Sequence, residues 1–443
     1  MVALSDLVSP EFRSLIGRAA VLVGTRFGGS LLTLVYTVLV ARIATPEDFG
    51  LAMLGLSAAL VASIPISLNI EGGSIRYLVA YRQSGASAKA RGFLRFNLWV
   101  LLGLSGLLVL AAAAAWGAGL LGAATARDRV VLLVALAAPI LAVTRVYGRH
   151  ATALDAVLRG SVPRMLIRPS VFCLVLGVIW ASDRTIAADT VMALFLVSAV
   201  LTALLQAWLL RGVFTFAPDG RADISDWRAW VGTGLMIAPL LLMRENLKNV
   251  IVVAAGLVLT TAEVGHLALA LSVLGIVIFA VKSIDIVIGP RLSRAIQDGR
   301  RAAASIYLAG SGAIKLVGAI LGLSLVLLLG DAIVAIFGRD YRPAGEVIAI
   351  LFLIPVANAV FGPTDIVLNI TGHRRTIFTV SLWSFAALVA FTALGGAIGA
   401  LEGAAWGAGL AYAVQQWVLW RRCLREAAID PSLLGIRRLF GRG

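Results

Sequence analysis

The chain has 443 residues, of which 60% are hydrophobic and 14% are charged, and its mean hydropathy is +0.96. A soluble domain has about a quarter charged residues, so this composition excludes a soluble globular protein and predicts a helical integral membrane protein. A net charge of +15 would suggest nucleic-acid binding in a soluble protein. Here positive cytoplasmic connections near anionic headgroups account for it, and we predict no nucleic-acid partner.

Apolar segments long enough to cross a bilayer recur from one end of the chain to the other. They are continuous and do not alternate with polar residues, which excludes a transmembrane β-barrel. The sequence therefore predicts an all-α membrane protein. Its twelve expected spans are residues 15–43, 49–70, 93–121, 130–150, 162–181, 187–210, 231–258, 264–288, 305–330, 344–362, 375–397 and 401–420.

The longest polar connection, residues 211–228, lies between the sixth and seventh expected spans and divides the chain into halves. This predicts four consecutive parts. They are an N-terminal lobe of six helices (1–215), a cytoplasmic linker (216–228), a C-terminal lobe of six helices (229–421) and a basic cytoplasmic tail (422–443).

Lysine and arginine residues are concentrated on alternate connections of this twelve-span arrangement. With the N-terminus inside the cell, the inner connections hold roughly four times as many of them as the outer turns. Because positive residues are retained on the cytoplasmic side, this bias predicts that the linker and both termini are cytoplasmic.

The two halves repeat each other. Residues 45–50 and 260–265 both contain a threonine, an acid at a helix start, a hydrophobic residue and a glycine, followed by an apolar helix. Two further pairs have nearly the same offset: Pro139 with Pro355, and Gly160 with Gly372. Six spans in each half give both halves the same orientation, which predicts a parallel repeat about an axis along the membrane normal.

The expected seventh span carries Arg244, Glu245 and Lys248 in its middle. A central Arg or Lys costs about 2.5–3.5 kcal/mol in a membrane helix, so a compensating role is expected. Glu245 and Lys248 lie one turn apart and can pair, which leaves one positive charge. Two interpretations stay open: a structural ion pair with a neighbouring helix, or a cationic site for an anionic substrate with Glu245 as charge partner or coupling residue.

No arrangement typical of an enzyme or a metal site occurs in the sequence. Cys173 and Cys423 do not indicate a disulfide framework, and three histidines are scattered along the chain. There is no Ser/His/Asp or paired-carboxylate pattern, and no outer turn is long enough for a catalytic domain. We therefore predict a protein that is not an enzyme and that needs no cofactor or metal.

Four stretches resemble the polysaccharide-transporter branch of the multidrug/oligosaccharidyl-lipid/polysaccharide exporter superfamily, the Wzx-type flippases. They are VARIATPEDFGLAML, its repeat GLVLTTAEVGHLALA, residues 336–341 (IFGRDY) and residues 368–373 (LNITGH). The resemblance implies two six-helix bundles that form a V around a central cavity in the bacterial inner membrane. The implied substrate is an undecaprenyl-pyrophosphate-linked oligosaccharide, and the implied partners are membrane lipids, a glycan polymerase and other glycan-assembly proteins.

In such a V, Arg26 and Arg244 would face each other across the cavity. They precede the repeat glycines Gly50 and Gly265 by 24 and 21 residues, a difference of about one helical turn. Arginine suits pyrophosphate because its planar guanidinium matches phosphate oxygens. The substrate-binding candidates are the cations at membrane depth: Arg26, Arg145, Arg168, Arg244, Lys248 and Lys315.

Some of these cations also have structural interpretations. Arg145 and Arg149 lie near the inner end of their helix, where long side chains snorkel to the interface. Lys282 and Asp285 are one turn apart and are expected to neutralise each other, whereas Lys315 has no carboxylate in its own helix.

A cation-coupled multidrug antiporter of the same superfamily is the alternative function. Proton or sodium coupling needs a carboxylate at cavity depth. Among the expected spans only Glu245 meets that requirement, which favours the flippase without excluding the antiporter.

Overall fold

The computed structural model describes residues 10–217 and 220–436, and all regular structure within these ranges is helical. The elements of the first half are α1 (Pro10–Ile43), α2 (Pro46–Ala62), η1 (Pro65–Ser67), η2 (Ile70–Gly73), α3 (Ser74–Gln83), α4 (Ser87–Gly117), α5 (Ala126–Ala153), α6 (Val157–Val162), η3 (Pro163–Ile167), α7 (Arg168–Ala181) and α8 (Ala188–Leu209). Those of the second half are α9 (Trp227–Glu245), α10 (Leu247–Ala255), α11 (Thr261–Gln297), α12 (Arg301–Ala335), η4 (Arg339–Tyr341), α13 (Pro343–Leu351), α14 (Leu353–Phe361), α15 (Thr364–Ile370), α16 (Arg374–Arg422), η5 (Cys423–Ala427) and η6 (Leu433–Ile436).

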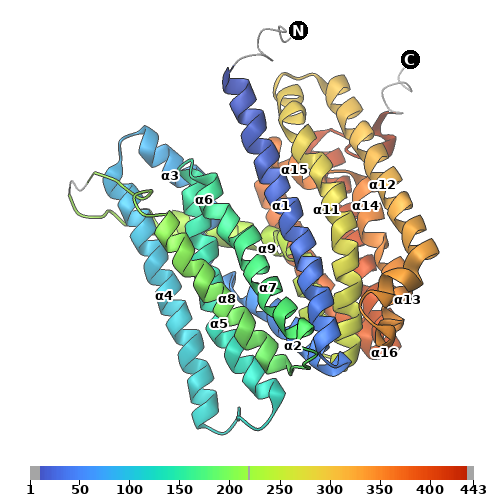
Figure 1. Ribbon diagram of the computed structural model, residues 1–443. Coiled ribbons are helices and arrows are strands. Elements are labelled where there is room, and N and C mark those ends of the chain that lie inside the picture. Colours follow the sequence, from blue (N-terminus) through green and yellow to red (C-terminus); the bar gives the residue numbers. More distant parts are fainter. Residues whose placement is uncertain (1–9, 218–219, 437–443) are drawn as a thin grey trace.

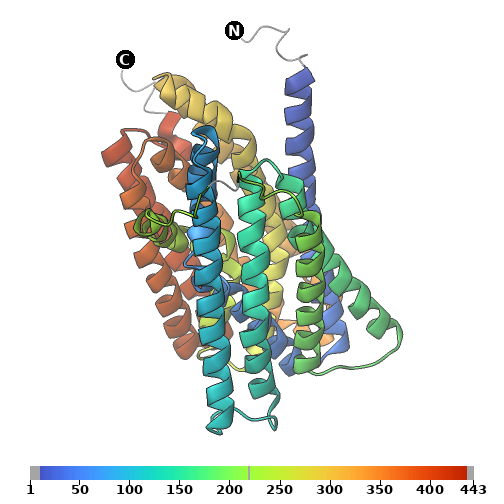
Figure 2. The same ribbon diagram turned by 90° about the vertical axis from the view of Figure 1, so that its left-hand side faces the viewer.

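The helices form two groups that meet at one end of the molecule and separate toward the other (Figure 1). One group contains α3–α8 and the other α11–α16, while α1 packs on both α7 and α11. Both described ends of the chain lie where the groups separate, and the α4–α5 connection lies at the opposite end (Figures 1 and 2). The molecule is therefore V-shaped, and it is open on the side that the charge bias predicts to be cytoplasmic.

Ten helices within the described ranges are long and apolar enough, by length and composition, to cross a membrane. One of them, α16, is two helices joined at a kink, because Gly399 and Ala400 have non-helical backbone angles. The kink lies between the expected eleventh and twelfth spans. The count of twelve also requires α9 and α10 to be taken as one broken span, and it stays a prediction.

The expected single helix over residues 231–258 is wrong, because the chain breaks at Asn246 between α9 and α10. α9 begins against the first half, where Trp230 is fully buried, packs on Phe93 and donates a 3.1 Å hydrogen bond to the Tyr81 hydroxyl. It ends in the second half, packed on α16. The charged cluster therefore lies at a helix break where the chain crosses between halves.

The repeated motifs adopt the same local structure in both halves. Thr45 caps α2 by accepting a hydrogen bond from the backbone N–H of Asp48 at 3.2 Å. Thr260 caps α11 in a capping box with Glu263. In both motifs the threonine accepts from an exposed N–H group at the helix start, whereas the acids differ: Glu263 accepts from the Thr260 N–H, and Asp48 accepts from the Ala188 N–H at the start of α8.

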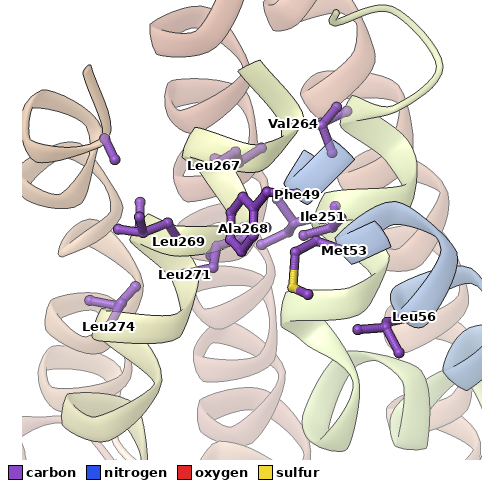
Figure 3. Close-up of a cluster of buried hydrophobic side chains, with 14 of the residues drawn as sticks. Phe49, Met53, Leu56, Ile251, Val264, Leu267, Ala268, Leu269, Leu271 and Leu274 are labelled. Carbon is purple, nitrogen blue, oxygen red and sulfur yellow. The ribbon is translucent and has the colours of Figure 1, made fainter. Parts of the chain in front are cut away.

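The glycines of the two motifs bring α2 and α11 into direct contact. A Cβ atom at Gly50 would overlap the carbonyl oxygen of Thr261, and one at Gly265 would lie 3.1 Å from the Gly50 Cα. Apolar side chains of α2, α10 and α11 fill the surrounding seam (Figure 3). They include Phe49, Met53, Leu56, Ile251, Val264, Leu267 and Leu271, all of them nearly or fully buried.

Polar contacts close the same end of the V. Arg42, next to the last residue of α1, donates hydrogen bonds to the carbonyl oxygens of Ile336 (2.7 Å) and Ala335 (2.9 Å) at the end of α12. The Tyr341 hydroxyl donates a 3.3 Å hydrogen bond to the Ala41 carbonyl. These contacts, which we call the Arg42 clasp, join the two halves at the end opposite the termini.

The first part of the expected basic tail packs against the second half. The Cys423 thiol is buried and contacts the Thr364 carbonyl oxygen at 3.4 Å. Asp430 accepts a 2.9 Å hydrogen bond from the Trp420 indole, and η6 packs on α12. Residues 437–443 of the tail lie outside the described residues.

Candidate functional site

A cavity of about 690 Å³ lies between the two halves, which both supply its walls. Helices α1, α5, α6, α7 and α8 and segment η3 line it from the first half, and α9 and α11 line it from the second. Its charged lining residues are Arg26, Arg149, Arg164, Arg168, Arg244, Glu245 and Lys282. Six cations and one carboxylate thus face this cavity among the described residues.

Close glycine packing builds the first-half wall. A Cβ atom at Gly148 would lie 2.6 Å from the Gly160 carbonyl oxygen, and one at Gly160 would lie 2.7 Å from the Gly148 carbonyl oxygen. α5 and α6 can therefore touch only because both positions are glycine. This contact puts Arg149 of α5 and Arg164 of the π-helical segment η3 in one wall, although they are distant along the chain.

Several first-half cations have no carboxylate partner. The Nε of Arg164 is buried without a hydrogen-bond partner in the described part of the chain. The Arg168 guanidinium lies 5.4 Å from the ring centroid of Phe195, a distance typical of a cation–π contact. Arg26 of α1 is exposed and forms no ion pair with a described side chain. These charges are available to an anion that enters the cavity.

The second-half wall is partly compensated. Arg244, near the end of α9, forms a 3.1 Å ion pair with Asp365 of α15. The Lys282 ammonium of α11 donates a 2.8 Å hydrogen bond to the carbonyl oxygen of Arg244. Lys282 thereby satisfies a carbonyl at the broken end of α9, and its positive charge stays without an ion-pair partner among the described side chains.

One ion pair crosses between the halves. The Nη2 of Arg149 donates to both carboxylate oxygens of Glu245, at 2.9 and 3.0 Å. Arg149 belongs to α5 and Glu245 is the last residue of α9, directly before the break at Asn246. The single carboxylate of the cavity is thus held by a cation of the opposite half.

Of the predicted binding residues, Arg26, Arg168 and Arg244 line the cavity and their binding stays a prediction, whereas Arg145 lies elsewhere. Arg145 is buried in a 2.5 Å ion pair with Glu71, and it donates a 2.6 Å hydrogen bond to the Ser63 carbonyl. The prediction that it faces the cavity is wrong, because its guanidinium neutralises a buried carboxylate within the first half.

Lys315 and Lys248 do not face the cavity either. Lys315 is fully buried in a 2.5 Å ion pair with Asp285, so the expected pairing of Asp285 with Lys282 is also wrong. The Lys248 ammonium donates a 2.7 Å hydrogen bond to the Ser272 hydroxyl on α11. Spacing within one helix could reveal neither contact, because each lysine finds its partner on another helix.

Three further cations line the cavity that were not among the predicted binding residues: Arg149, Arg164 and Lys282. The position of Arg149 near a helix end favours snorkelling, and the spacing of Lys282 favours neutralisation on its own helix. Arg164 contributes only to the positive-inside bias. The spacing of Arg164 and Arg168, four residues apart and followed by Pro169, is the one sequence signal that could have indicated a shared helical face. Binding by any of these residues stays a prediction.

The lining has no chemistry typical of metal binding. No group of three or more His, Cys, Asp or Glu side chains that could hold an ion occurs within the described ranges. What the arrangement can do is hold an anion, because its charge is predominantly positive and its arginines offer several N–H donors.

No protein-family model matches the chain, and no curated protein matches it. Solved structures do. The chain is similar to an inward-facing multidrug resistance MATE family transporter of the MOP superfamily, with 15% identity, a TM-score of 0.65 and 90% of this chain and 95% of that chain covered. It is also similar to the lipid II flippase MurJ in an inward closed conformation, with 12% identity, a TM-score of 0.62 and 95% of this chain and 92% of that chain covered. A third similar structure is the MATE multidrug transporter DinF-BH, with 14% identity, a TM-score of 0.59 and 93% of this chain and 95% of that chain covered. At these identities the likeness establishes the fold alone, which confirms the expected all-α architecture.

Proposed function

We propose that this protein moves an undecaprenyl-pyrophosphate-linked oligosaccharide from the inner to the outer leaflet by alternating access. The observation that carries the proposal is the cavity between the halves, with six cations and one carboxylate in its lining. The fold shared with the lipid II flippase MurJ supports it, as does the sequence resemblance to Wzx-type flippases.

The charge balance fits a pyrophosphate headgroup. Arg149 and Arg244 have carboxylate partners, whereas Arg26, Arg164, Arg168 and Lys282 form no ion pair with a described side chain. A pyrophosphate with about two negative charges would bind to these unpaired cations, which would offset the cost of removing it from water. The polyprenyl tail stays in the bilayer, and no covalent chemistry is required.

Transport of a fluorescent lipid-linked oligosaccharide into the outer leaflet of proteoliposomes tests this proposal. Arg26→Ala and Arg164→Ala each remove a cavity cation that has no carboxylate partner among the described side chains, and each is expected to lower the transport rate about 10- to 100-fold. Arg159→Ala is the matched control, since Arg159 lies on neighbouring α6, is exposed and does not line the cavity. Equal rates for all three variants would reject the proposal.

Cation-coupled antiport remains the second candidate, because MATE multidrug transporters share the fold and Glu245 lies in the cavity. Against it, Glu71, Glu245, Asp285 and Asp365 are each held in an ion pair. In sealed vesicles, moving two negative charges outward gains about 4–5 kcal/mol per 100 mV. An inside-negative potential should therefore accelerate flipping, whereas flux driven only by a proton or sodium gradient would favour the antiporter.

A further inference from the structure

The ion pairs of this protein differ sharply in their access to water. The side chains of Arg145 and Glu71 are 8% and 1% exposed, while those of Arg149 and Glu245 are 33% and 41% exposed. A pair in contact with water can separate at little cost, whereas separating a buried pair leaves an unsolvated charge. Of these two pairs, the Arg149–Glu245 pair is the exchangeable one, and it lies in the cavity.

A headgroup phosphate that bound to Arg149 would meet Glu245 there. Among the described residues the Glu245 carboxylate accepts hydrogen bonds only from the Nη2 of Arg149, which leaves the other guanidinium nitrogens open to a ligand. Arg164 and Arg168 line the same cavity, and the Nε of Arg164 has no hydrogen-bond partner in the described residues. An anion bound to these arginines would compete with Glu245 for Arg149.

We propose that Glu245 is an internal counter-anion that makes the cavity selective for pyrophosphate headgroups over monophosphate headgroups. This inference rests on the proposed function and deepens it. A monophosphate has a single phosphoryl group, so when it displaces Glu245 it mainly replaces the carboxylate at Arg149. A pyrophosphate brings further charge and oxygens that reach Arg149 and Arg164 together, so it gains contacts beyond those that it replaces.

Displacement has a second consequence, because the pair joins the halves. Arg149 is on α5, and Glu245 is followed by the break between α9 and α10. A bound pyrophosphate would thus release one contact between the halves at the moment the cavity fills. A ligand can shift a protein between two conformations only if it interacts differently with each of them. Loss of the Arg149–Glu245 contact on binding would supply such a difference.

Binding of undecaprenyl pyrophosphate and undecaprenyl monophosphate to the purified full-length protein tests the proposal. The wild type should bind the pyrophosphate more tightly. Glu245→Gln should raise monophosphate affinity more than pyrophosphate affinity and so reduce the preference about two- to five-fold. Glu245→Asp keeps the charge and should keep the preference, and Glu402→Gln, an exposed carboxylate on α16, is the matched control.

The outcomes separate this inference from the function on which it rests. If the wild type binds neither lipid, the proposed function fails and the inference fails with it. If the wild type prefers the pyrophosphate and Glu245→Gln keeps the same preference, only the inference fails. Melting temperatures of all variants show whether each is folded. The distance between spin labels on the α3–α4 and α11–α12 connections should change in Glu245→Gln in the same direction as it changes when the wild type binds pyrophosphate.

Discussion

At the scale of single residues, burial separates charges that hold the fold from charges that line the cavity. Lys315 and Asp285 show the structural case, since the lysine is fully buried and contacts both Asp285 and the Asn358 side chain. Two ions removed from water stabilise a fold only through each other, so neither is tolerated alone. Arg26 is the opposite case, since it is exposed in the cavity and has no carboxylate partner among the described side chains. No ion pair within the fold therefore accounts for its charge.

Lys315→Met tests the structural role because it leaves the Asp285 carboxylate buried without its partner. We expect a loss of about 3–5 kcal/mol in the free energy of unfolding. The double variant Lys315→Met with Asp285→Leu should recover most of this loss, because two apolar side chains need no partner. Denaturant unfolding in detergent measures both, and a single variant as stable as the double would contradict the assignment.

At the scale of elements, the seam between α2 and α11 holds the halves together at the closed end of the V. It consists of two capped helix starts that touch at Gly50 and Gly265, surrounded by apolar side chains (Figure 3). The seam needs both backbone proximity and side-chain packing, so a single added methyl group at the contact should lower the stability of the protein.

Gly50→Ala should destabilise the protein by about 1–3 kcal/mol, since its Cβ would meet the backbone of Thr261, which cannot rotate away as a side chain would. Gly103→Ala on α4 is the matched control, because a Cβ there meets nothing within 4 Å. Thermal unfolding of the two variants tests this prediction. An equal fall in melting temperature for both would show that the α2–α11 contact is not close.

The Arg42 clasp predicts a second effect at the same end. Arg42→Ala removes both hydrogen bonds to the last carbonyls of α12, and with them a favourable cation at a helix C-terminus. The distribution of distances between spin labels on the α1–α2 and α12–α13 connections should broaden toward longer values. Arg127→Ala, an exposed cation at the start of α5, should leave the distribution unchanged; a similar broadening there would assign the effect to net charge.

At the scale of the whole molecule, the direction of the V depends on which end faces the cytoplasm. The end where the groups separate carries both described chain ends (Figure 1), and the lysine and arginine bias predicts that this end is inside. The V therefore opens toward the end that the charge bias predicts to be cytoplasmic.

Cysteine labelling in intact cells tests that orientation, in a background with the two native cysteines replaced. Single cysteines at Gly85, Asp298 and His373 should react only after the cells are permeabilised. Those at Glu47, Asp128 and Asp340 should react from outside. Outside labelling at Gly85 or Asp298 would overturn the predicted topology.

The sequence by itself determined the features that depend on local chemistry. Continuous apolar runs specified membrane helices, and the repeat of Thr45 and Gly50 in Thr260 and Gly265 specified two similar helix starts, because short motifs are enough to define caps and glycine contacts. Composition likewise specified a cationic protein with few charges at membrane depth, and three of the predicted binding residues, Arg26, Arg168 and Arg244, lie in the cavity.

Only the tertiary structure decided which charges meet. Lys315 and Asp285 lie on different helices, as do Arg145 and Glu71, so no spacing along the chain could show that these cations are neutralised. Tertiary packing also brings Glu245, the last residue of α9, against Arg149 of α5 in the other half. The physical reason is that the free energy of a charge in a membrane protein depends on its nearest partner and on water, and both are set by helices distant in sequence.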